Sequence, residues 1–552
     1  MEELLSQKSG KKVILLGNEA IIRGALEEGV SFVSTYPGTP ASEIGSVFFK
    51  LFQDKKYKGY FEFSTNEKVA LESGIGASFS GLKTLVAMKN FGLNVCLDSL
   101  FPFVYTGTRG PTVIIVADDP SCHSSAQSEE NSRFIGFAAH IPVLEPADPQ
   151  ECKDFVRFAF EISEKYKIPV IVRTTTRVAH QKMPVILGKM PKLIILKGKF
   201  VKDARRFITL PPRVLEMKEE LLEKMEKIKE LSEKSDVNPV VNKTQDKKIG
   251  IITSGISYLN SMEALSELKL SLPVLKLGFF NPLPEEKIKK FVKPLKKVLI
   301  VEELEPYLQK EVERLAKSVN CKLQISGKDL LPETGELKPE QIVSALAEFA
   351  DVKYKRQDAG YKVRALKRSP QLCPGCPYWL VIAAIKKAVD VKKVIFGGEI
   401  GCYMLFGNSP INLQDYLSCM GSSVGIAHGI KKAANQKIIS FVGDSSFFHA
   451  GIPALVNTVF NKSNPLIIIL NNETTAMTGH QPHPAASSES PGINIEAVVR
   501  ACGVKYVKTI DQVNQEEFTK TVKDFLDKDE VSVIVAKHPC LFVAKKNGKN
   551  KN

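Results

Sequence analysis

The sequence lacks the features typical of membrane, secreted and nucleic-acid-binding proteins. No run of eighteen apolar residues occurs, so we expect no membrane-spanning helix. The first twelve residues, MEELLSQKSGKK, contain no apolar signal segment, which predicts a cytoplasmic protein. The net charge of +15 comes from dispersed lysines without an aromatic–basic recognition motif. We therefore expect a solvated surface and no binding of nucleic acid.

Cysteine is also scarce, with 10 residues in a chain of 552. This excludes the disulfide framework that holds small secreted domains together. Cysteines that cluster are therefore predicted to serve a metal or redox site. The length predicts three or four domains, and 43% hydrophobic with 25% charged residues is typical of a globular protein with ample core.

Residues 438–484 form the stretch around which the chain is organised. Two apolar runs, 438–442 and 466–470, are typical of parallel strands buried on both faces, and a helical pattern separates them. The carboxyl ends of such strands meet at one edge of the sheet, which places Asp444 close to Asn472. Their carboxylate and amide oxygens suit Mg²⁺, whose other ligands come from phosphate and water. The same residues also form turns, so sequence alone leaves both interpretations open.

The rest of the chain predicts an α/β protein with three doubly wound parallel sheets. We expect domains at residues 1–185, 248–353 and 362–545, a helical and charged linker at 186–247 and a disordered tail at 546–552. Predicted strands cover residues 12–16, 32–35, 61–64, 84–88, 112–117, 143–144, 169–172, 249–253, 274–277, 297–301, 393–396, 438–442, 466–470 and 531–536.

Acidic residues follow predicted strands at two places in the chain. Glu67 precedes a helix rich in small residues, where it is either an acid stabilised by the helix N-terminus or a buried carboxylate that contacts a ligand. Glu67 by itself favours the first interpretation. Glu302 and Glu303 end a strand of the middle domain, and nothing beyond their position indicates a function.

Four cysteines of the last domain have positions that allow a shared site. Cys373 and Cys376 precede a predicted helix, and Cys402 and Cys540 each follow a strand. Because these positions can meet at one sheet edge, four thiolates could hold a [4Fe–4S] cluster or a zinc ion. A CxxC pair before a helix is also typical of thiol–disulfide exchange. The other six cysteines are expected to be core residues.

Several short motifs in one order resemble the 2-oxoacid:ferredoxin oxidoreductases, and among them the alpha subunits of the indolepyruvate type. The resemblance covers about residues 11–545. The motifs are YPGTP at 36–40, NEKVA at 66–70, GLNV at 92–95, ADDPSCHSS at 117–125, RTTTR at 173–177, CPGCP at 373–377, GEIGCY at 398–403, MG at 420–421, GDS at 443–445 and NN at 471–472.

The resemblance implies a pyrimidine-binding first domain, a transketolase C-terminal-like middle domain and a diphosphate-binding last domain. It makes Glu67 the partner of the aminopyrimidine of thiamine diphosphate. Thr39 is implied, by analogy, to contact the substrate carboxylate, and His480 and His483 to act as acids or bases or to cap the cofactor. The implied Mg²⁺ ligands are Asp444, Asn472 and the carbonyl of Thr474; the implied cofactor contacts are Met420, Gly421, Gly443 and Ser445; the implied [4Fe–4S] ligands are Cys373, Cys376, Cys402 and Cys540.

The implied activity is the oxidation of a 2-oxo acid, such as indolepyruvate, to its acyl-coenzyme A, with electrons passed through the cluster to ferredoxin. The implied partners are a smaller beta subunit and ferredoxin or a ferredoxin-like subunit, in a hetero-oligomer. The basic surface would attract an acidic ferredoxin.

The sequence departs from the family at several points. It lacks the ferredoxin-like domain with two CxxCxxCxxxC runs, so we expect electrons to leave through the proximal cluster or a separate subunit. Ser445 and His480 each replace a glycine, and Glu399 replaces an aspartate. The alternatives are a non-redox decarboxylase or carboligase, and a non-catalytic subunit stabilised by zinc.

Overall fold

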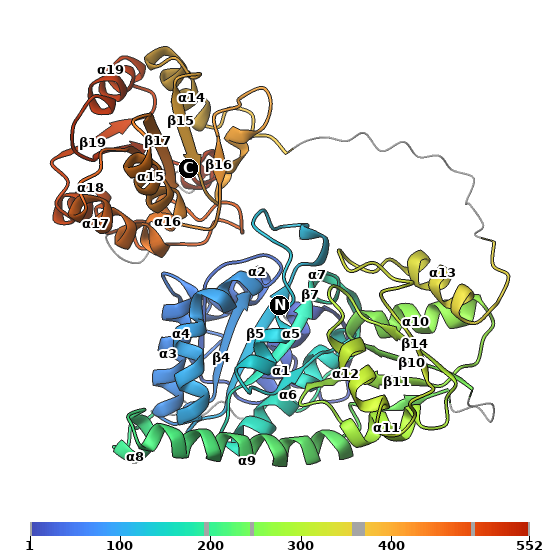
Figure 1. Ribbon diagram of the computed structural model, residues 1–552. Helices are drawn as coiled ribbons and strands as arrows, with labels where there is room; N and C mark the ends of the chain where they lie inside the picture. The colour runs from blue at the N-terminus through green and yellow to red at the C-terminus, as the bar shows by residue number, and fades with distance from the viewer. Residues whose placement is uncertain (1–2, 192–197, 243–247, 356–369, 487–491, 550–552) are drawn as a thin grey trace. The chain divides into compact units, whose positions relative to one another are not determined.

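The computed structural model describes residues 3–191, 198–242, 248–355, 370–486 and 492–549 (Figure 1). The chain forms two compact units, residues 1–359 and 360–552. Within the described ranges no helix combines the length and the apolar character needed to cross a bilayer. The α/β class with parallel sheets is confirmed, since each of the three large sheets is mainly parallel.

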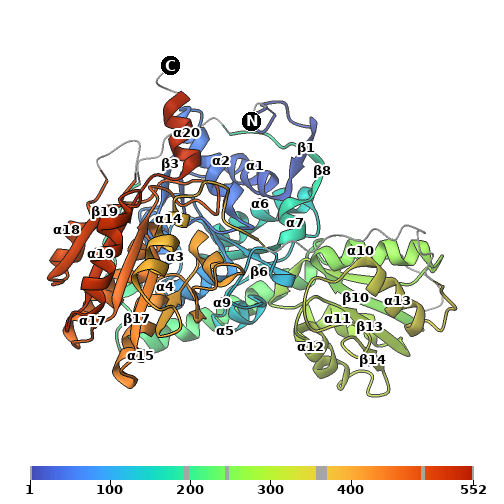
Figure 2. The ribbon, with the colours of Figure 1, turned by 90° about the horizontal axis from the view of Figure 1, so that it is seen from above.

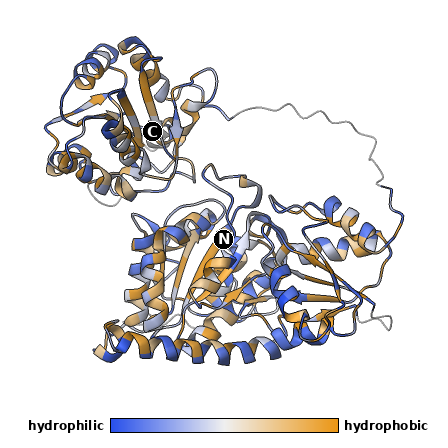
Figure 3. Ribbon diagram, viewed as in Figure 1, coloured by the Kyte–Doolittle hydropathy of each residue, from blue (hydrophilic) through white to orange (hydrophobic). Residues whose placement is uncertain are grey.

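The first unit contains a seven-stranded sheet in the order β12-β6-β7-β5-β4-β2-β3. Its central strands are buried on both faces, which explains their continuous apolar runs (Figure 3). The strands are β2 (Phe32–Thr35), β3 (Tyr60–Phe63), β4 (Thr84–Lys89), β5 (Thr112–Asp118), β6 (Val143–Leu144), β7 (Val170–Thr175) and β12 (Phe279–Asn281). The helices are α1 (Gly17–Glu27), α2 (Ser42–Gln53), α3 (Glu67–Phe79), α4 (Asn90–Thr106), α5 (Arg133–Ala138), α6 (Pro149–Tyr166) and α7 (Thr176–His180).

The predicted strand at residues 12–16 forms, but outside this sheet. β1 (Lys12–Leu16) pairs antiparallel with β8 (Lys182–Ile186) in a separate two-stranded sheet. Val13 and Leu15 are buried while Ile14 is 66% exposed, so β1 packs through one face only. A strand that is buried on one face and exposed on the other is expected in a sheet at the surface of the unit.

The middle sheet has five strands in the order β14-β13-β10-β11-β9, and only β9 runs antiparallel to its neighbour. Figure 2 shows it between the pair α10 and α13 and the pair α11 and α12. Its strands are β9 (Val240–Val241), β10 (Ile249–Ser254), β11 (Val274–Leu277), β13 (Lys297–Val301) and β14 (Gln324–Ser326). Its helices are α10 (Gly255–Glu267), α11 (Glu285–Val292), α12 (Tyr307–Ala316) and α13 (Pro339–Phe349).

The described residues of the segment 186–247, which we expected to be a linker, are part of the first unit. It contains α8 (Ala204–Phe207) and α9 (Arg213–Lys234), and α9 runs along the edge of the unit below α3 and α4 (Figure 1). The amphipathic pattern explains the packing, because Met217, Leu221 and Ile228 are buried on one stripe. Residues 192–197 and 243–247 lie outside the described residues.

The second unit contains a six-stranded parallel sheet in the order β16-β15-β17-β18-β20-β19. The strands are β15 (Val394–Gly398), β16 (Tyr416–Leu417), β17 (Lys437–Gly443), β18 (Leu466–Asn471), β19 (Tyr506–Asp511) and β20 (Ser532–Lys537). The longer helices are α14 (Tyr378–Ala388), α15 (Ser422–Ala433), α17 (Ile452–Phe460), α18 (Ile495–Ala501), α19 (Gln515–Leu526) and α20 (Leu541–Lys549). The short turn α16 (Asp444–Ser446) follows β17.

Helix α20 corrects the expectation of a disordered tail from residue 546. Its first residues, Leu541 and Phe542, line one cavity together with Cys540. The helix then continues to Lys549, and residues 550–552 lie outside the described residues.

Candidate active site

The carboxyl edge of the six-stranded sheet brings Asp444 and Asn472 together, as the strand–helix–strand pattern predicts. Asp444 is 3% exposed. Its Oδ2 accepts hydrogen bonds from the backbone N–H of Asn472, at 3.0 Å, and of Glu473, at 2.9 Å. The Asn472 Oδ1 accepts from the N–H of Thr474 at 3.1 Å. A carboxylate and an amide oxygen therefore lie close together at this edge, and such hard oxygen ligands suit Mg²⁺.

His483, not His480, contacts this edge. The buried His483 Nε2 lies 3.2 Å from Asp444 Oδ2. The loop after β18 doubles back through bridges between Thr475 and Gln481 and between His483 and Ala486, which returns His483 to the aspartate. His480 is exposed and its ring lies 5.5 Å from that of Phe542. Sequence offered no signal to separate them, because both histidines lie in the same loop.

Glu399 is a buried acid at the same edge, and the sequence indicated it only as a substitution. Its carboxylate accepts hydrogen bonds from the Tyr403 hydroxyl, from the N–H of Gly421 and, at 3.3 Å, from the N–H of Gly443. Complete burial raises the pKa of Glu399 to about 7. Gly421 has φ of 78°, and a Cβ there would lie 2.7 Å from the Ala450 carbonyl carbon, so the turn requires glycine.

Met420 and Ser445, two further expected cofactor contacts, flank this arrangement. Met420 is half-buried and immediately precedes Gly421. Ser445 follows Asp444, and its hydroxyl oxygen lies 3.1 Å from that of Thr475. Both residues lie next to groups at this sheet edge, and their contact with a cofactor stays a prediction.

All four cysteines of the expected cluster line one cavity of about 220 Å³. Burial raises the pKa of Cys376 to about 11 and that of Cys402 to about 12, and the neighbouring cysteines contribute to both shifts. In the described part of the chain, no three histidine, cysteine or acidic side chains converge on a single ion. The four cysteines thus share one cavity, and their binding of a cluster stays a prediction.

The cysteine cavity adjoins the Asp444 loop. Asn472 lines the cavity, and its backbone carbonyl accepts a hydrogen bond from the N–H of Cys540 at 2.9 Å. The same residue donates its N–H to Asp444. A cluster in the cavity and a diphosphate at Asp444 would thus share Asn472 as a common neighbour. His480 also lines the cavity.

Glu67 and Thr39 lie at the carboxyl edge of the seven-stranded sheet in the first unit. Glu67 is 6% exposed and begins α3, whose N-terminus is capped by the Asn66 side chain. A Cβ on Gly92 would lie 2.4 Å from the Glu67 Cγ, so glycine leaves the space that the acid occupies. Thr39 follows β2, with its hydroxyl 3.4 Å from that of Ser42. A carboxylate held in this way can share a proton with a pyrimidine nitrogen.

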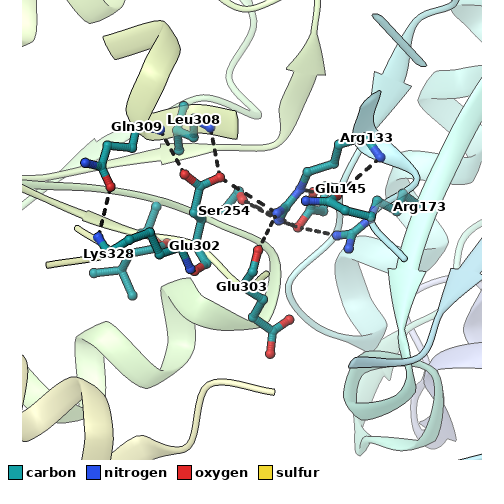
Figure 4. Close-up of polar contacts among 12 residues, drawn as sticks. Arg133, Glu145, Arg173, Ser254, Glu302, Glu303, Leu308, Gln309 and Lys328 are labelled. Carbon is teal, nitrogen blue, oxygen red and sulfur yellow. Dashed lines mark hydrogen bonds and ion pairs between the residues drawn. The ribbon is translucent and has the colours of Figure 1, made fainter. Parts of the chain in front are cut away.

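The carboxyl edge of the middle sheet holds a buried ionic cluster, formed by Arg133, Glu145, Arg173, Glu302 and Glu303 (Figure 4). Arg133 binds Glu145 through Nε at 2.9 Å and Nη2 at 2.6 Å, and donates from Nη1 to the Glu303 carbonyl at 3.1 Å. Arg173 Nη1 lies 3.0 Å from the same glutamate. The position of Glu302 and Glu303 thus has a structural explanation.

The acids of this cluster are bound by protein groups. Glu302 accepts the N–H of Leu308 and of Gln309 at 2.8 Å each, at the start of α12. Glu303 accepts the N–H of Leu337 at 3.1 Å, and burial raises its pKa to about 7. Burial alone would raise the pKa of Glu145, but the two arginines lower it.

Comparison with known proteins matches both units. A family described as pyruvate flavodoxin/ferredoxin oxidoreductase, thiamine diphosphate-binding, matches residues 23–246, and one described as thiamine pyrophosphate enzyme, C-terminal TPP binding domain, matches residues 399–536. The chain is 42% identical to indolepyruvate oxidoreductase subunit IorA of Methanothermobacter thermautotrophicus over 98% of this chain and 89% of that one. It is 41% identical to IorA of Pyrococcus horikoshii over 97% of this chain and 87% of that one.

The chain is also similar, at lower identity, to proteins named for 2-oxoglutarate. The chain is 27% identical to 2-oxoglutarate synthase subunit KorA of Archaeoglobus fulgidus, over 58% of this chain and 96% of that one. Among solved structures, 2-oxoglutarate:ferredoxin oxidoreductase of Magnetococcus marinus is 19% identical with a TM-score of 0.49, over 61% of this chain and 65% of that one.

Proposed function

Because the chain belongs to the IorA subunits of indolepyruvate oxidoreductase, a branch of the thiamine diphosphate-dependent 2-oxoacid:ferredoxin oxidoreductases, we propose that it oxidatively decarboxylates an aryl pyruvate to the acyl-coenzyme A. Electrons leave through a [4Fe–4S] cluster to ferredoxin, and a smaller beta subunit completes a hetero-oligomer. The observation that carries this proposal is the cysteine cavity beside the Asp444 loop, with Asn472 common to both.

Thiamine diphosphate supplies the electron sink for decarboxylation when it is bound. In the second unit, Asp444, the Asn472 side chain and the Thr474 carbonyl would hold the Mg²⁺ that the diphosphate of the cofactor requires. His483 keeps the Asp444 carboxylate in place, and Gly421 and Gly443 allow the ligand a close approach to the backbone. Met420 and Ser445 line the same edge.

In the first unit, the side chain of Glu67 occupies the space left by Gly92. There it would share a proton with the aminopyrimidine of the cofactor. Thr39 binds the substrate carboxylate through its hydroxyl. In the second unit, His480 at the cysteine cavity is a candidate acid or base.

Cys373, Cys376, Cys402 and Cys540 supply the thiolates of the cluster. A cluster held there would supply a one-electron acceptor next to Asn472 of the cofactor edge. A non-redox decarboxylase would have no use for four thiols around one cavity.

The test is an anaerobic assay of the chain with its partner subunit, Mg²⁺, thiamine diphosphate, coenzyme A and ferredoxin. We expect indolepyruvate to be oxidised faster than pyruvate or 2-oxoglutarate. Glu67→Gln should lower turnover by about 10²–10⁴-fold, the usual loss for a general acid–base group. Its matched control is Glu72→Gln, which changes an exposed acid on the same helix. Glu67→Gln protein that turns over at the control's rate would overturn the proposal.

A further inference from the structure

The first unit contains a cavity of about 270 Å³. It lies at the edge of the seven-stranded sheet opposite to the edge that holds Glu67 and Thr39. It lies where α8 and α9 cross the ends of α4 and α6, just before β5 and β7 begin (Figure 1). The cavity is therefore at the amino edge of the strands, whereas the proposed thiamine site is at their carboxyl edge. We call this cavity the anion pocket.

Positive charge predominates in the anion pocket. Its charged lining residues are Lys167, Arg206, Arg213 and Lys224 with one acid, Glu220. Arg213 neutralises the acid, since its two Nη atoms lie 2.6 and 3.0 Å from the two Glu220 carboxylate oxygens. In the described part of the chain, no carboxylate lies within ion-pair distance of Lys167, Arg206 or Lys224. Arg206 and Lys224 are half-buried and Lys167 is exposed. Asp203 acts on Arg206, and Glu220 on Lys224, only at longer range than an ion pair.

The helix ends offset only part of this charge. α4 and α6 end at the pocket, and each helix C-terminus carries about half a negative charge. Arg206 also donates from Nη2 to the carbonyl of Thr108, in the turn after α4. Two helix ends compensate about one positive charge, so the pocket keeps an excess of positive charge.

The remaining cations are partly removed from water. Burial lowers the pKa of Lys224, and the nearby Arg206 adds to the effect. Gly107 allows this approach, since its φ is 67° and a Cβ there would lie 3.4 Å from Lys224 Nζ and 2.3 Å from the Lys167 carbonyl. Like charges held close in a half-buried cavity are unfavourable unless an anion joins them.

We propose that the anion pocket binds a phosphate group, as inorganic phosphate or as a small phosphate monoester. A phosphate dianion matches the excess charge, and the guanidinium of Arg206 with the ammonium of Lys224 are suitable donors for its oxygens. The bound anion would join α8 and α9 to the ends of α4 and α6. This site is independent of the thiamine diphosphate site and of the proposed reaction.

The test is isothermal titration of the full chain with inorganic phosphate and, separately, with AMP, at constant ionic strength. Lys224→Gln should weaken binding about tenfold or more, because it removes one charged hydrogen-bond donor. Lys227→Gln, which removes an exposed lysine from the same helix, is the matched control and should leave binding unchanged. Tighter binding of AMP identifies a monoester as the ligand, and equal binding identifies free phosphate; both support the pocket.

The absence of saturable binding to the wild-type chain with either ligand would overturn the proposal. Equal weakening by both lysine variants would also overturn it, because the effect would then be one of net charge. If Lys224→Gln does not fold, the proposal is tested by the thermal unfolding midpoint of the wild-type chain. It should rise with phosphate and not with chloride at the same ionic strength, and an equal response to both salts contradicts the proposal.

Discussion

At the carboxyl edge of the middle sheet, protein side chains fill the positions where a ligand would bind, whereas a cavity remains at the same edge of the last sheet. Glu145 lies so close to the start of α10 that a Cβ on Gly255 would be 2.5 Å from its Oε1. Glu302 occupies the N–H groups that begin α12. In the last sheet, Asn472 instead borders the 220 Å³ cysteine cavity, and its N–H is bound by Asp444.

The comparison shows that parallel topology places polar residues at the carboxyl edge of a sheet. The neighbouring elements determine whether that edge is filled by side chains or left open for a ligand. The middle edge receives Arg133 from α5 and Arg173 from β7, which compensate its acids. Such an edge joins two sheets and has no room for a substrate. The last edge presents oxygen donors and thiols around open space, as a cofactor site requires.

The largest effect should come from breaking the filled edge. Arg133→Met leaves Glu145 and Glu302 buried beside one fewer cation, so the first unit should lose about 3–5 kcal/mol of unfolding free energy. Chemical denaturation measures this loss. Arg205→Met, at a side chain that is 77% exposed, is the control and should change little. An equal response of the two variants would show that the ionic cluster does not hold the sheets together.

A smaller effect on stability, but a large one on binding, is expected at the open edge. Asp444→Asn should weaken the binding of Mg²⁺ and thiamine diphosphate by about 100-fold or more. Substitution of a residue that only hydrogen-bonds a metal ligand lowers metal affinity by up to about 100-fold, and loss of a ligand should lower it at least as much. Calorimetry of the second unit's site in the full chain measures it, with exposed Asp390→Asn as control. Undiminished binding in Asp444→Asn would remove this aspartate from the site.

The ionic cluster should also make stability depend on pH. Burial raises the pKa of Glu303 to about 7, so the folded chain holds a proton that the unfolded chain loses near its ordinary pKa of 4.5. Stability from this group is complete below that value and is lost as pH rises through about 7. Wild type should lose about 2 kcal/mol between about pH 5.5 and about pH 8.

Glu303→Gln should lose less stability over the same interval, because its amide does not titrate. Denaturation curves of both chains at the two pH values give the comparison. Parallel pH profiles for wild type and variant would contradict the assignment to Glu303.

The smallest effect is expected at a cysteine outside the cavity. Cys321 is exposed and belongs to the middle domain, so Cys321→Ser should change stability by less than about 0.5 kcal/mol. It should leave metal content unchanged, in contrast to serine at a cavity cysteine. Loss of metal in Cys321→Ser would show that the cavity does not define the cysteine site.

Local patterns predicted most of the elements but few of the contacts between them. The strands at 32–35, 274–277 and 297–301 have the expected bounds, because their apolar runs end at turn residues. The crossing of β12 to the seven-stranded sheet and the pairing of β1 with β8 depend on distant segments. No local pattern marks such pairings.

The same limit applies to the candidate site. Asp444 and Asn472 could be placed together because adjacent parallel strands fix both. The role of Glu399 depends on Gly421 and Gly443, and that of His483 on a loop that doubles back. Sequence separates Glu399 from the two glycines by 22 and 44 residues, and only the fold brings them into contact.

The most direct test of the account is the iron, acid-labile sulfide and zinc content of the anaerobically purified chain. We predict about four irons and four sulfides per chain, lost in Cys376→Ser and retained in Cys321→Ser. Zinc at the cavity, or no metal in a chain that binds thiamine diphosphate, would contradict the claim that this open edge joins the cofactor to an electron-transfer cluster.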